Sequence, residues 1–300
     1  MEFEGRVEPE LMVELTAPAG HTELAADELW QLGATAVEVR DITGESSVVV
    51  ASFPTAAATR QIAAELADRA ARLVAADPAW RTAWRRYAEP VHIGRRLVVA
   101  PAWRPVAVGS GPLVLRIDPG DCFGSGSHPS TRMILAELQA TPPGPTLEVL
   151  DVGCGSGILS VAAAALGLGR ATAIDIDEAA LITTRANSEA NGVADRVMPS
   201  GRSLTSVTGP FDLALVNVTA AVHAQVGLDV MGRMRAGGRI LLAGLLPGQW
   251  RHVAGAYAGT TVTRRLNLEG WEGLDLTVRP DPEDEGPATG EGAAAADASR

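Results

Sequence analysis

Residues 147–157 read Leu-Glu-Val-Leu-Asp-Val-Gly-Cys-Gly-Ser-Gly, an apolar strand that runs directly into a turn with Gly153, Gly155 and Gly157. Glycine has no Cβ, so such a turn lets the backbone approach a ligand closely. In open α/β sheets, ligands bind beyond the carboxyl ends of the strands, where turns of this kind lie. The stretch therefore predicts a doubly wound α/β fold with a ligand site at the turn.

The spacing of the glycines narrows the choice of ligand. A dinucleotide fingerprint would place its third glycine at position 158, but that residue is Ile158, and Gly157 falls one position early. Asp151, just ahead of the turn, is a poor neighbour for a pyrophosphate and suits a ligand with positive charge. The sulfonium and ammonium groups of S-adenosylmethionine (SAM) meet that requirement, and a dehydrogenase is disfavoured.

Composition excludes several classes of protein. A net charge of −11 argues against sequence-independent binding of nucleic acid, which needs a basic surface, although it permits a basic protein partner. Two cysteines provide neither a disulfide framework nor a zinc cluster, and we expect no metal. No apolar run approaches the roughly 18 residues of a membrane helix, and the N-terminus lacks the features of a signal peptide. We therefore expect a cytoplasmic protein that does not bind membranes.

Four segments are expected from length and pattern. Residues 1–77 predict a small α+β domain of ferredoxin-like type, with strands at 11–17, 36–40 and 47–53 and helices at 21–32 and 59–75. Residues 78–104 form a connector that contains Trp80, Trp84, Tyr87 and Trp103, and residues 105–280 form the main domain. Residues 281–300 carry six acids and one arginine and predict a disordered tail.

The main domain alternates strand and helix, which is typical of a mostly parallel sheet covered on both faces. Short strands at 97–100 and 113–117 precede the alternation, and segments 261–268 and 274–278 predict an antiparallel pair at the sheet edge. The alternating strands are expected at 149–152, 172–176, 196–198, 213–216 and 239–242, with helices at 158–166, 178–191 and 220–234.

Polar residues at the ends of two of these strands are candidate ligands. Asp175 follows the second strand 22 residues after Gly153, the position at which doubly wound folds bind ribose hydroxyls. Asp177 is better explained as the N-cap of the following helix. Asn217 ends the fourth strand, and position alone leaves it either a ligand or a turn asparagine that satisfies its own backbone. The motif after it, Val-Thr-Ala, disfavours methyltransferases that act on bases or glutamine.

Residues 118–131, Asp-Pro-Gly-Asp-Cys-Phe-Gly-Ser-Gly-Ser-His-Pro-Ser-Thr, form a long loop rich in glycine and serine. It is either a plain surface loop or a functional loop over a pocket, and the Phe and His within it favour the second. We expect Phe123, Gly124 and Gly126 to line the cofactor site. Thr131 is expected to cap a helix that starts near Arg132 and to offer its hydroxyl to the ligand.

Together these residues resemble the PrmA family of ribosomal protein L11 methyltransferases. The loop 118–131 is similar to that family's D-P-G-x-A-F-G-T-G-T-H-P-T-T, and 149–158, 174–177 and 187–193 are also similar to family motifs. The departures are serines at 125, 127 and 130 in place of threonine, cysteine at 122 in place of alanine, and Val-Thr after Asn217 in place of Ile-Leu. The last change lies nearest the methyl acceptor.

The resemblance implies a Rossmann-like class I methyltransferase domain with a mostly parallel seven-stranded sheet and a smaller substrate-recognition domain on a mobile linker. It implies SAM binding at Thr131, Gly153, Asp175 and Asn217. It also implies methylation of α-amino and lysine ε-amino groups of the stalk-base protein of the large ribosomal subunit, free or on the ribosome. No general base is identified, because the sulfonium is already activated and the site mainly aligns a neutral amine with the methyl group.

Two alternatives stay open at this point. A related methyltransferase with another acceptor, either a different protein lysine or a small amine, has the same cofactor motifs. A non-catalytic SAM- or nucleotide-binding module would bind the ligand without turnover. All 25 basic residues are arginine, so a lysine-directed enzyme with this sequence has no lysine of its own to modify.

Overall fold

The computed structural model describes residues 11–18, 21–34, 36–43, 46–53, 55–75, 88–106, 111–120 and 122–280. The expectations for Trp80, Trp84 and Tyr87 and for the tail at 281–300 lie outside these residues. No helix in the described ranges is long and apolar enough to cross a membrane.

The N-terminal unit is a four-stranded antiparallel sheet in the order β2-β3-β1-β4, as the ferredoxin-like pattern predicts. Two helices pack on it and enclose a core that includes Val13, Leu29 and Val49. Its elements are β1 (Leu11–Pro18), α1 (Thr22–Gln31), β2 (Ala36–Thr43), β3 (Ser46–Ser52), α2 (Ala56–Glu65) and β4 (Arg72–Ala75).

The second helix of this unit is shorter than predicted. A continuous helix was expected over 59–75, but α2 ends at Glu65, and a 3-10 turn at Ala67–Arg69 leads to Ala70 in the left-handed conformation. The chain then pairs with β1 as β4, with Leu73 opposite Val13. Helix propensity in the Ala- and Arg-rich segment is overridden because pairing β4 with β1 completes the sheet.

A small three-stranded sheet leads into the main domain. Strands β5 (Val91–Ile93), β6 (Leu97–Pro101) and β7 (Leu113–Ile117) pair in that order. Leu97 and Leu115 are fully buried in the same core as the main sheet. This sheet spans the expected boundary at residues 104 and 105, and its shared core favours a main domain that begins before Val91.

The main sheet has seven strands in the order β10-β9-β8-β11-β12-β14-β13, which confirms the predicted Rossmann-like architecture. Strands β10 to β12 are parallel, and β14 and β13 add the expected antiparallel pair at one edge. The strands are β8 (Glu148–Val152), β9 (Arg170–Ile174), β10 (Val197–Ser200), β11 (Phe211–Asn217), β12 (Met234–Leu245), β13 (Thr260–Leu268) and β14 (Trp271–Val278).

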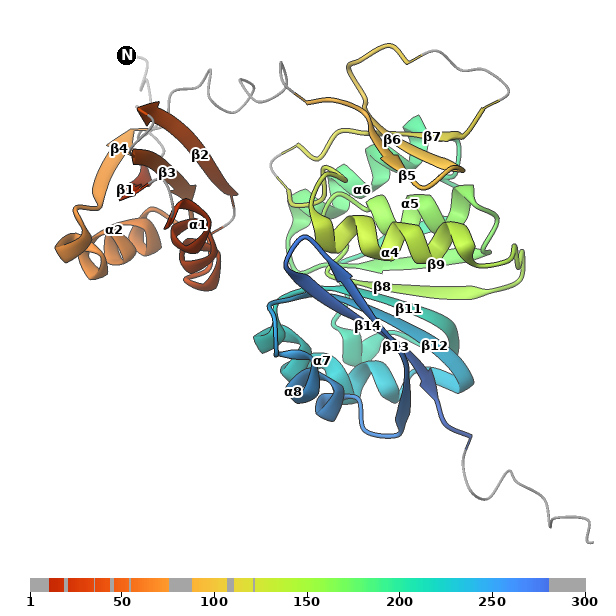
Figure 1. The fold of residues 1–300 in the computed structure, drawn as a ribbon. Helices are drawn as coiled ribbons and strands as arrows, with labels where there is room; N and C mark the ends of the chain where they lie inside the picture. Colours follow the sequence, from red (N-terminus) through yellow and green to blue (C-terminus); the bar gives the residue numbers. More distant parts are fainter. Residues whose placement is uncertain are drawn as a thin grey trace, which may run out of the picture.

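Helices cover both faces of this sheet (Figure 1). One face carries α4 (Pro129–Ala140), α5 (Ile158–Ala165) and α6 (Glu178–Ala190), and the other carries α7 (Ala220–Met231) and α8 (Trp250–Ala256). Helix α7 was expected to reach residue 234, but it ends at Met231 because the chain turns at Gly232 and enters β12 at Met234.

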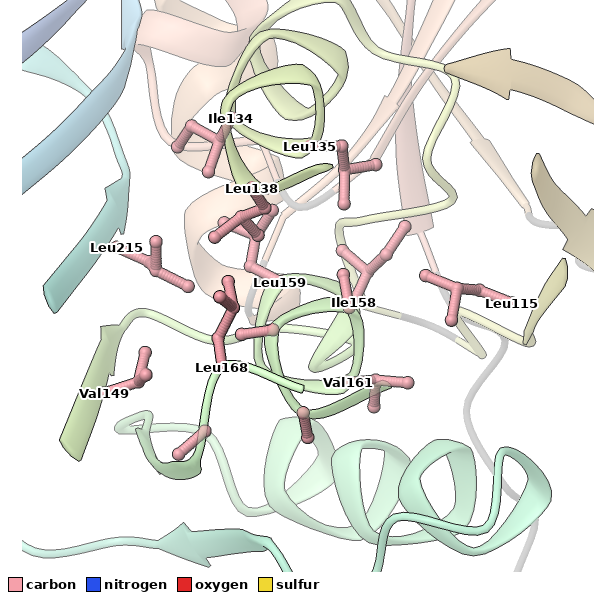
Figure 2. Close-up of a cluster of buried hydrophobic side chains, with 14 of the residues drawn as sticks. Leu115, Ile134, Leu135, Leu138, Val149, Ile158, Leu159, Val161, Leu168 and Leu215 are labelled. Atoms are coloured by element: carbon pink, nitrogen blue, oxygen red, sulfur yellow. The ribbon is translucent and has the colours of Figure 1, made fainter. Parts of the chain in front are cut away.

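The larger core centres on α5, which is apolar on nearly all sides. Figure 2 shows Leu159 and Val161 of this helix among Leu135 and Leu138 of α4 and Val149 of β8. A helix buried on all sides is held firmly, so the glycine turn that precedes α5 starts from a rigid support. The turn at 153–157 is therefore anchored by α5, a helix of eight residues of which seven are buried.

Candidate active site

Three neighbouring strands deliver the predicted ligand-binding residues to one edge of the sheet. The turn Gly153–Gly157 follows β8, Asp175 follows β9 and Asn217 ends β11. Since β9, β8 and β11 are adjacent and parallel, their carboxyl ends lie side by side. The fold thus brings together residues that are up to 64 positions apart, at the edge where open α/β sheets bind ligands.

Asp175 organises the glycine turn as well as facing the edge. Its Oδ2 accepts a hydrogen bond from the backbone N–H of Gly155 at 2.9 Å, and its Oδ1 accepts one from the N–H of Asp177 at 3.0 Å. A carboxylate has lone pairs beyond these two bonds, so it can still accept from ligand hydroxyls. Asp177 caps α6 by accepting from Ala179 at 2.9 Å, which confirms its predicted structural role.

The loop at 122–126 is bound to the glycine turn through its backbone. The carbonyl oxygen of Phe123 accepts from the N–H of Ser156 at 3.0 Å, and that of Gly124 accepts from the Ser156 hydroxyl at 2.7 Å. A Cβ on Gly155, whose φ is +52°, would lie 2.7 Å from the Phe123 carbonyl oxygen. Gly155 is therefore required for the loop to close on the turn.

Thr131 meets Asn217 inside this frame. The amide nitrogen of Asn217 donates to the Thr131 hydroxyl at 3.1 Å, and Thr131 is fully buried. Thr131 is not the helix cap that was expected. Helix α4 starts at Pro129, and His128 is its N-cap because proline is well suited to the first helical position. The hydroxyl of Thr131 is thereby left for Asn217.

Asp151 was interpreted as a neighbour of a cationic ligand, but the structure buries it below the edge of the sheet. The residue is fully buried, and its Oδ2 accepts from the backbone N–H and the hydroxyl of Ser160 at 3.1 and 2.6 Å. Burial raises the pKa of this carboxyl to about 7, against the lowering effect of the Ser160 bonds. Its Oδ1 has no partner among the described residues. In this structure Asp151 joins the turn to α5.

Asn187 of α6 and Asn191, the residue that ends this helix, hold the start of the neighbouring loop by hydrogen bonds to its backbone. Asn187 donates from Nδ2 to the carbonyl oxygens of Asp118 and Ser156 at 2.9 and 2.8 Å, and its Oδ1 accepts from the N–H of Asp118 at 3.0 Å. Asn191 makes the same pair of bonds with Arg116. Both hold the entry to the loop at 118–131, so they position the site without facing it.

His223 supports the turn after Asn217, a role that the sequence analysis missed. Its Nε2 donates to the carbonyl oxygen of Ala243 at 2.9 Å, and its Nδ1 accepts from the Tyr257 hydroxyl at 2.9 Å. Burial lowers the pKa of His223 to about 4, so the ring is neutral. Gly244 follows Ala243, and a Cβ there would lie 2.3 Å from the Val218 carbonyl oxygen, so β12 also packs directly on this turn.

Two further side chains at the edge were also missed. Ile176, between Asp175 and Asp177, is fully exposed and offers apolar surface beside the carboxylate. Trp271 begins β14 and lies with its ring centroid 4.5 Å from that of His128. An isoleucine flanked by two acids is a local signal that sequence reasoning can use. No local signal marks Trp271, because its position depends on how the last hairpin pairs.

No group of three His, Cys, Asp or Glu side chains that could hold a metal occurs among the described residues. Cys122 is half-buried, and Cys154 is buried with its thiol pKa raised by desolvation. The chemistry available at the edge is therefore that of one carboxylate, amide and hydroxyl groups, backbone polar groups and aromatic rings.

Comparison with known proteins gives a consistent result. The family model described as ribosomal protein L11 methyltransferase (PrmA) matches residues 12–278. A ribosomal protein L11 methyltransferase of Syntrophotalea carbinolica is 33% identical over 84% of this chain and 92% of its own length. One from Geobacter sp. (strain M21) is 40% identical over 66% of each chain. The crystal structure of a ribosomal protein L11 methylase from Lactobacillus delbrueckii subsp. bulgaricus aligns with a TM-score of 0.59 and 26% identity, over 64% of this chain and all of that one.

Proposed function

Because the chain belongs to the PrmA family of ribosomal protein L11 methyltransferases, we propose that it transfers methyl groups from SAM to amino groups of ribosomal protein L11. The observation that carries the proposal is the convergence of the glycine turn, Asp175 and the Asn217–Thr131 pair at the carboxyl edge of the sheet. The chain is a methyltransferase, and SAM is its methyl donor.

Separate residues at this edge suit the ribose and the adenine of SAM. Asp175, held by the Gly155 N–H, would accept hydrogen bonds from the ribose hydroxyls. The exposed side chain of Ile176 would pack against the adenine ring. Gly153, Gly155 and Gly157 all have positive φ, which glycine adopts without strain, so they allow the turn whose backbone lies at this edge.

The rest of the proposed cofactor site comes from the loop and from β11. Phe123, Gly124 and Gly126 lie on the loop that the N–H and the hydroxyl of Ser156 hold against the glycine turn. Thr131 and Asn217 would lie toward the reacting end of the ligand. Asn217 is half-buried and spends its amide N–H on Thr131, so its carbonyl oxygen stays free to accept from an amine or ammonium.

The transfer itself needs alignment more than acid–base chemistry. SAM, when bound, supplies a methyl group already activated on a sulfonium sulfur. An amide oxygen on Asn217 orients an acceptor N–H by hydrogen bonding and leaves the nitrogen lone pair free for attack. Holding a neutral amine in line with the methyl group turns a bimolecular step into an effectively unimolecular one.

The acceptor is proposed from the family together with charge. A chain with a net charge of −11 attracts a basic protein such as a ribosomal protein and repels the nucleic-acid backbone. We assign recognition to the N-terminal α+β unit, the acceptor to the stalk base of the large subunit, either free or on the ribosome, and the location to the cytoplasm.

The test combines cofactor binding with transfer. The purified full chain should bind SAM in calorimetry and transfer labelled methyl groups to purified L11 from the same organism. Label in methyl-lysine must come from the acceptor, since the enzyme contains no lysine. Transfer to another protein or to a small amine in place of L11 would reassign the acceptor. Binding without any transfer would favour a non-catalytic module, and no SAM binding would overturn the proposal.

A further inference from the structure

Resting on the proposed function, we propose that the rings of Phe123, His128 and Trp271 form an aromatic subsite that receives the acceptor nitrogen and stabilises its positive charge. Phe123 then has two separate roles. Its carbonyl oxygen accepts from the Ser156 N–H of the glycine turn, and its ring packs against that of His128.

The three rings come together at the edge of the sheet that carries the candidate site. Strand β14 runs antiparallel to β12, with Glu272 opposite Leu245, so Trp271 at its start lies at the carboxyl end of the parallel strands. His128 is the N-cap of α4, three residues before Thr131, which is bonded to Asn217. The rings are therefore next to the pair assigned to the reacting end of the ligand.

The three rings form an edge-to-face cluster and not a parallel stack. The centroids of Phe123 and His128 lie 5.3 Å apart with planes at 68°, and those of His128 and Trp271 lie 4.5 Å apart at 71°. Rings near right angles present faces in different directions, and an aromatic face is the negative side of its quadrupole. Recognition of methylated ammonium groups uses such sets of faces.

The exposure of these rings is not explained by packing of the core. Phe123 is 41% exposed, and His128 and Trp271 are half-buried, whereas the nearby core residues Leu115 and Ile134 are fully buried. Phe123 also contacts Trp30 of α1 edge-on, at 6.1 Å between centroids. Aromatic surface left open at the ligand edge is typical of a binding site.

The charges around the rings also suit a cationic guest. Burial lowers the pKa of His128 to about 4, although nearby Glu269 acts to raise it, so the imidazole is uncharged at neutral pH. Its Nδ1 accepts from the Ser130 N–H at 3.3 Å. The guanidinium of Arg132 is paired with Glu269 at 2.7 Å, so its charge is compensated.

The subsite acts on the charge that develops during transfer. The amine lone pair forms the new N–C bond while the C–S bond breaks, and its electron pair stays on sulfur, giving a neutral thioether. The nitrogen becomes positive and afterwards releases a proton to water. Neutral aromatic faces stabilise that positive nitrogen without accepting its proton, and they leave space for methyl groups where a hydrogen-bond acceptor would not.

Trp271→Leu tests the inference against Trp250→Leu. Trp250 is another aromatic residue of the same domain. Its ring lies against the guanidinium groups of Arg251 and Arg265. We expect Trp271→Leu to raise KM for the acceptor about fivefold or more while Kd for SAM stays within twofold. Trp271→Phe should recover most of the loss, and Trp250→Leu should leave KM near that of the parent.

A competition experiment on the unaltered enzyme does not depend on how the variants fold. A product peptide with a trimethylated amine should inhibit more strongly than its isostere in which carbon replaces the charged nitrogen. Equal inhibition by the two peptides, or an unchanged KM in Trp271→Leu, overturns the subsite. Those outcomes require an active parent enzyme, so they are distinct from failure of the proposed function, in which the parent transfers no methyl group.

Discussion

The side-chain amide of Asn217 donates to the hydroxyl of Thr131 across 3.1 Å, which joins the end of β11 to the first turn of α4 over a separation of 86 residues. Thr131 is fully buried, so its hydroxyl is not shared with bulk water. The bond fixes which way the Asn217 amide is turned, with nitrogen toward α4. In the proposed site, the carbonyl oxygen is then the end of the amide that is available to a ligand.

Removing the Thr131 hydroxyl should disturb catalysis through Asn217. Thr131→Val keeps the size of the side chain and leaves the Asn217 N–H without its partner, at a cost of about 1–2 kcal/mol in the free energy of unfolding. The amide then loses its fixed orientation, so we expect kcat to fall about tenfold at saturating SAM. Thr131→Ser, which keeps the hydroxyl, is the control. If the Val and Ser variants share the same kcat, the bond has no catalytic role.

Asp175 and Asp177 form a matched pair for testing the cofactor site. In Asp175→Asn the single amide oxygen can still accept from the Gly155 N–H, but the bond from the Asp177 N–H and the charged acceptor for ribose hydroxyls are lost. We expect Kd for SAM to rise about tenfold or more, the worth of roughly 1.5–3 kcal/mol for hydrogen bonds to a charged group. Asp177→Asn should stay within twofold, because Asn caps helices as well as Asp. Calorimetry on the two variants decides the point, and equal affinities would remove Asp175 from the site.

Alanine substitutions at Gly155 and Gly192 distinguish the cost of backbone strain from the cost of a clash with the loop. Both have positive φ, +52° and +67°, so a Cβ costs each about 1–2 kcal/mol. A Cβ at Gly192 meets nothing within 4 Å, whereas one at Gly155 lies 2.7 Å from the Phe123 carbonyl oxygen. Gly155→Ala should therefore lose about 1–3 kcal/mol more in denaturant unfolding and bind SAM poorly. Comparable unfolding curves for the two variants would show that the loop does not press on the turn.

Asp151 predicts a definite pH dependence of stability. Its pKa is raised from 3.8 to about 7 in the folded state, so the folded form keeps a proton that the unfolded form has released above pH 4. The stabilisation from this proton is complete below pH 4 and is lost as pH rises through 7, and its upper limit is about 4 kcal/mol. Asp151→Asn should remove this contribution.

The measurement is the free energy of unfolding of the parent and of Asp151→Asn at several pH values. The parent should lose stability relative to the variant between pH 4 and 7. His128 and His223, with pKa values lowered to about 4, act in the opposite direction, since their effect is lost as pH falls below 6.5. They are present in both proteins and cancel in the difference. A flat difference would show that Asp151 is ionised in the folded protein.

The parts of the fold that depend on neighbouring residues were predictable from the sequence. The Asp177 cap and the alternation of strand and helix after residue 130 follow from short-range patterns, and the structure has them. The error at α2 has the opposite origin. Residues 72–75 have a helical composition but become β4 because β1 offers an open edge. Pairing between distant segments outweighs local propensity there.

The same distinction holds within the candidate site. Asp175 and Asn217 could be proposed as ligand residues because open α/β sheets bind ligands beyond the carboxyl ends of their strands, and the structure has both at that edge. The buried place of Asp151 was not predicted, since strand periodicity does not say whether a carboxylate faces the ligand or α5. Trp271 was missed because its neighbour His128 is 143 positions away and meets it only through the pairing of β14 with β12.

The loop at 122–128 has one end bonded to the glycine turn through Phe123 and the other packed against the final hairpin through His128 and Trp271. A single short segment thus contacts both the glycine turn of the proposed cofactor site and the ring of Trp271 in the proposed acceptor subsite. In the proposed site, a shift of this loop on donor binding would change the affinity for the amine, and by thermodynamic reciprocity the amine would change the affinity for the donor by the same factor. The proposed cofactor side and acceptor side of the site are thereby coupled through the seven residues 122–128.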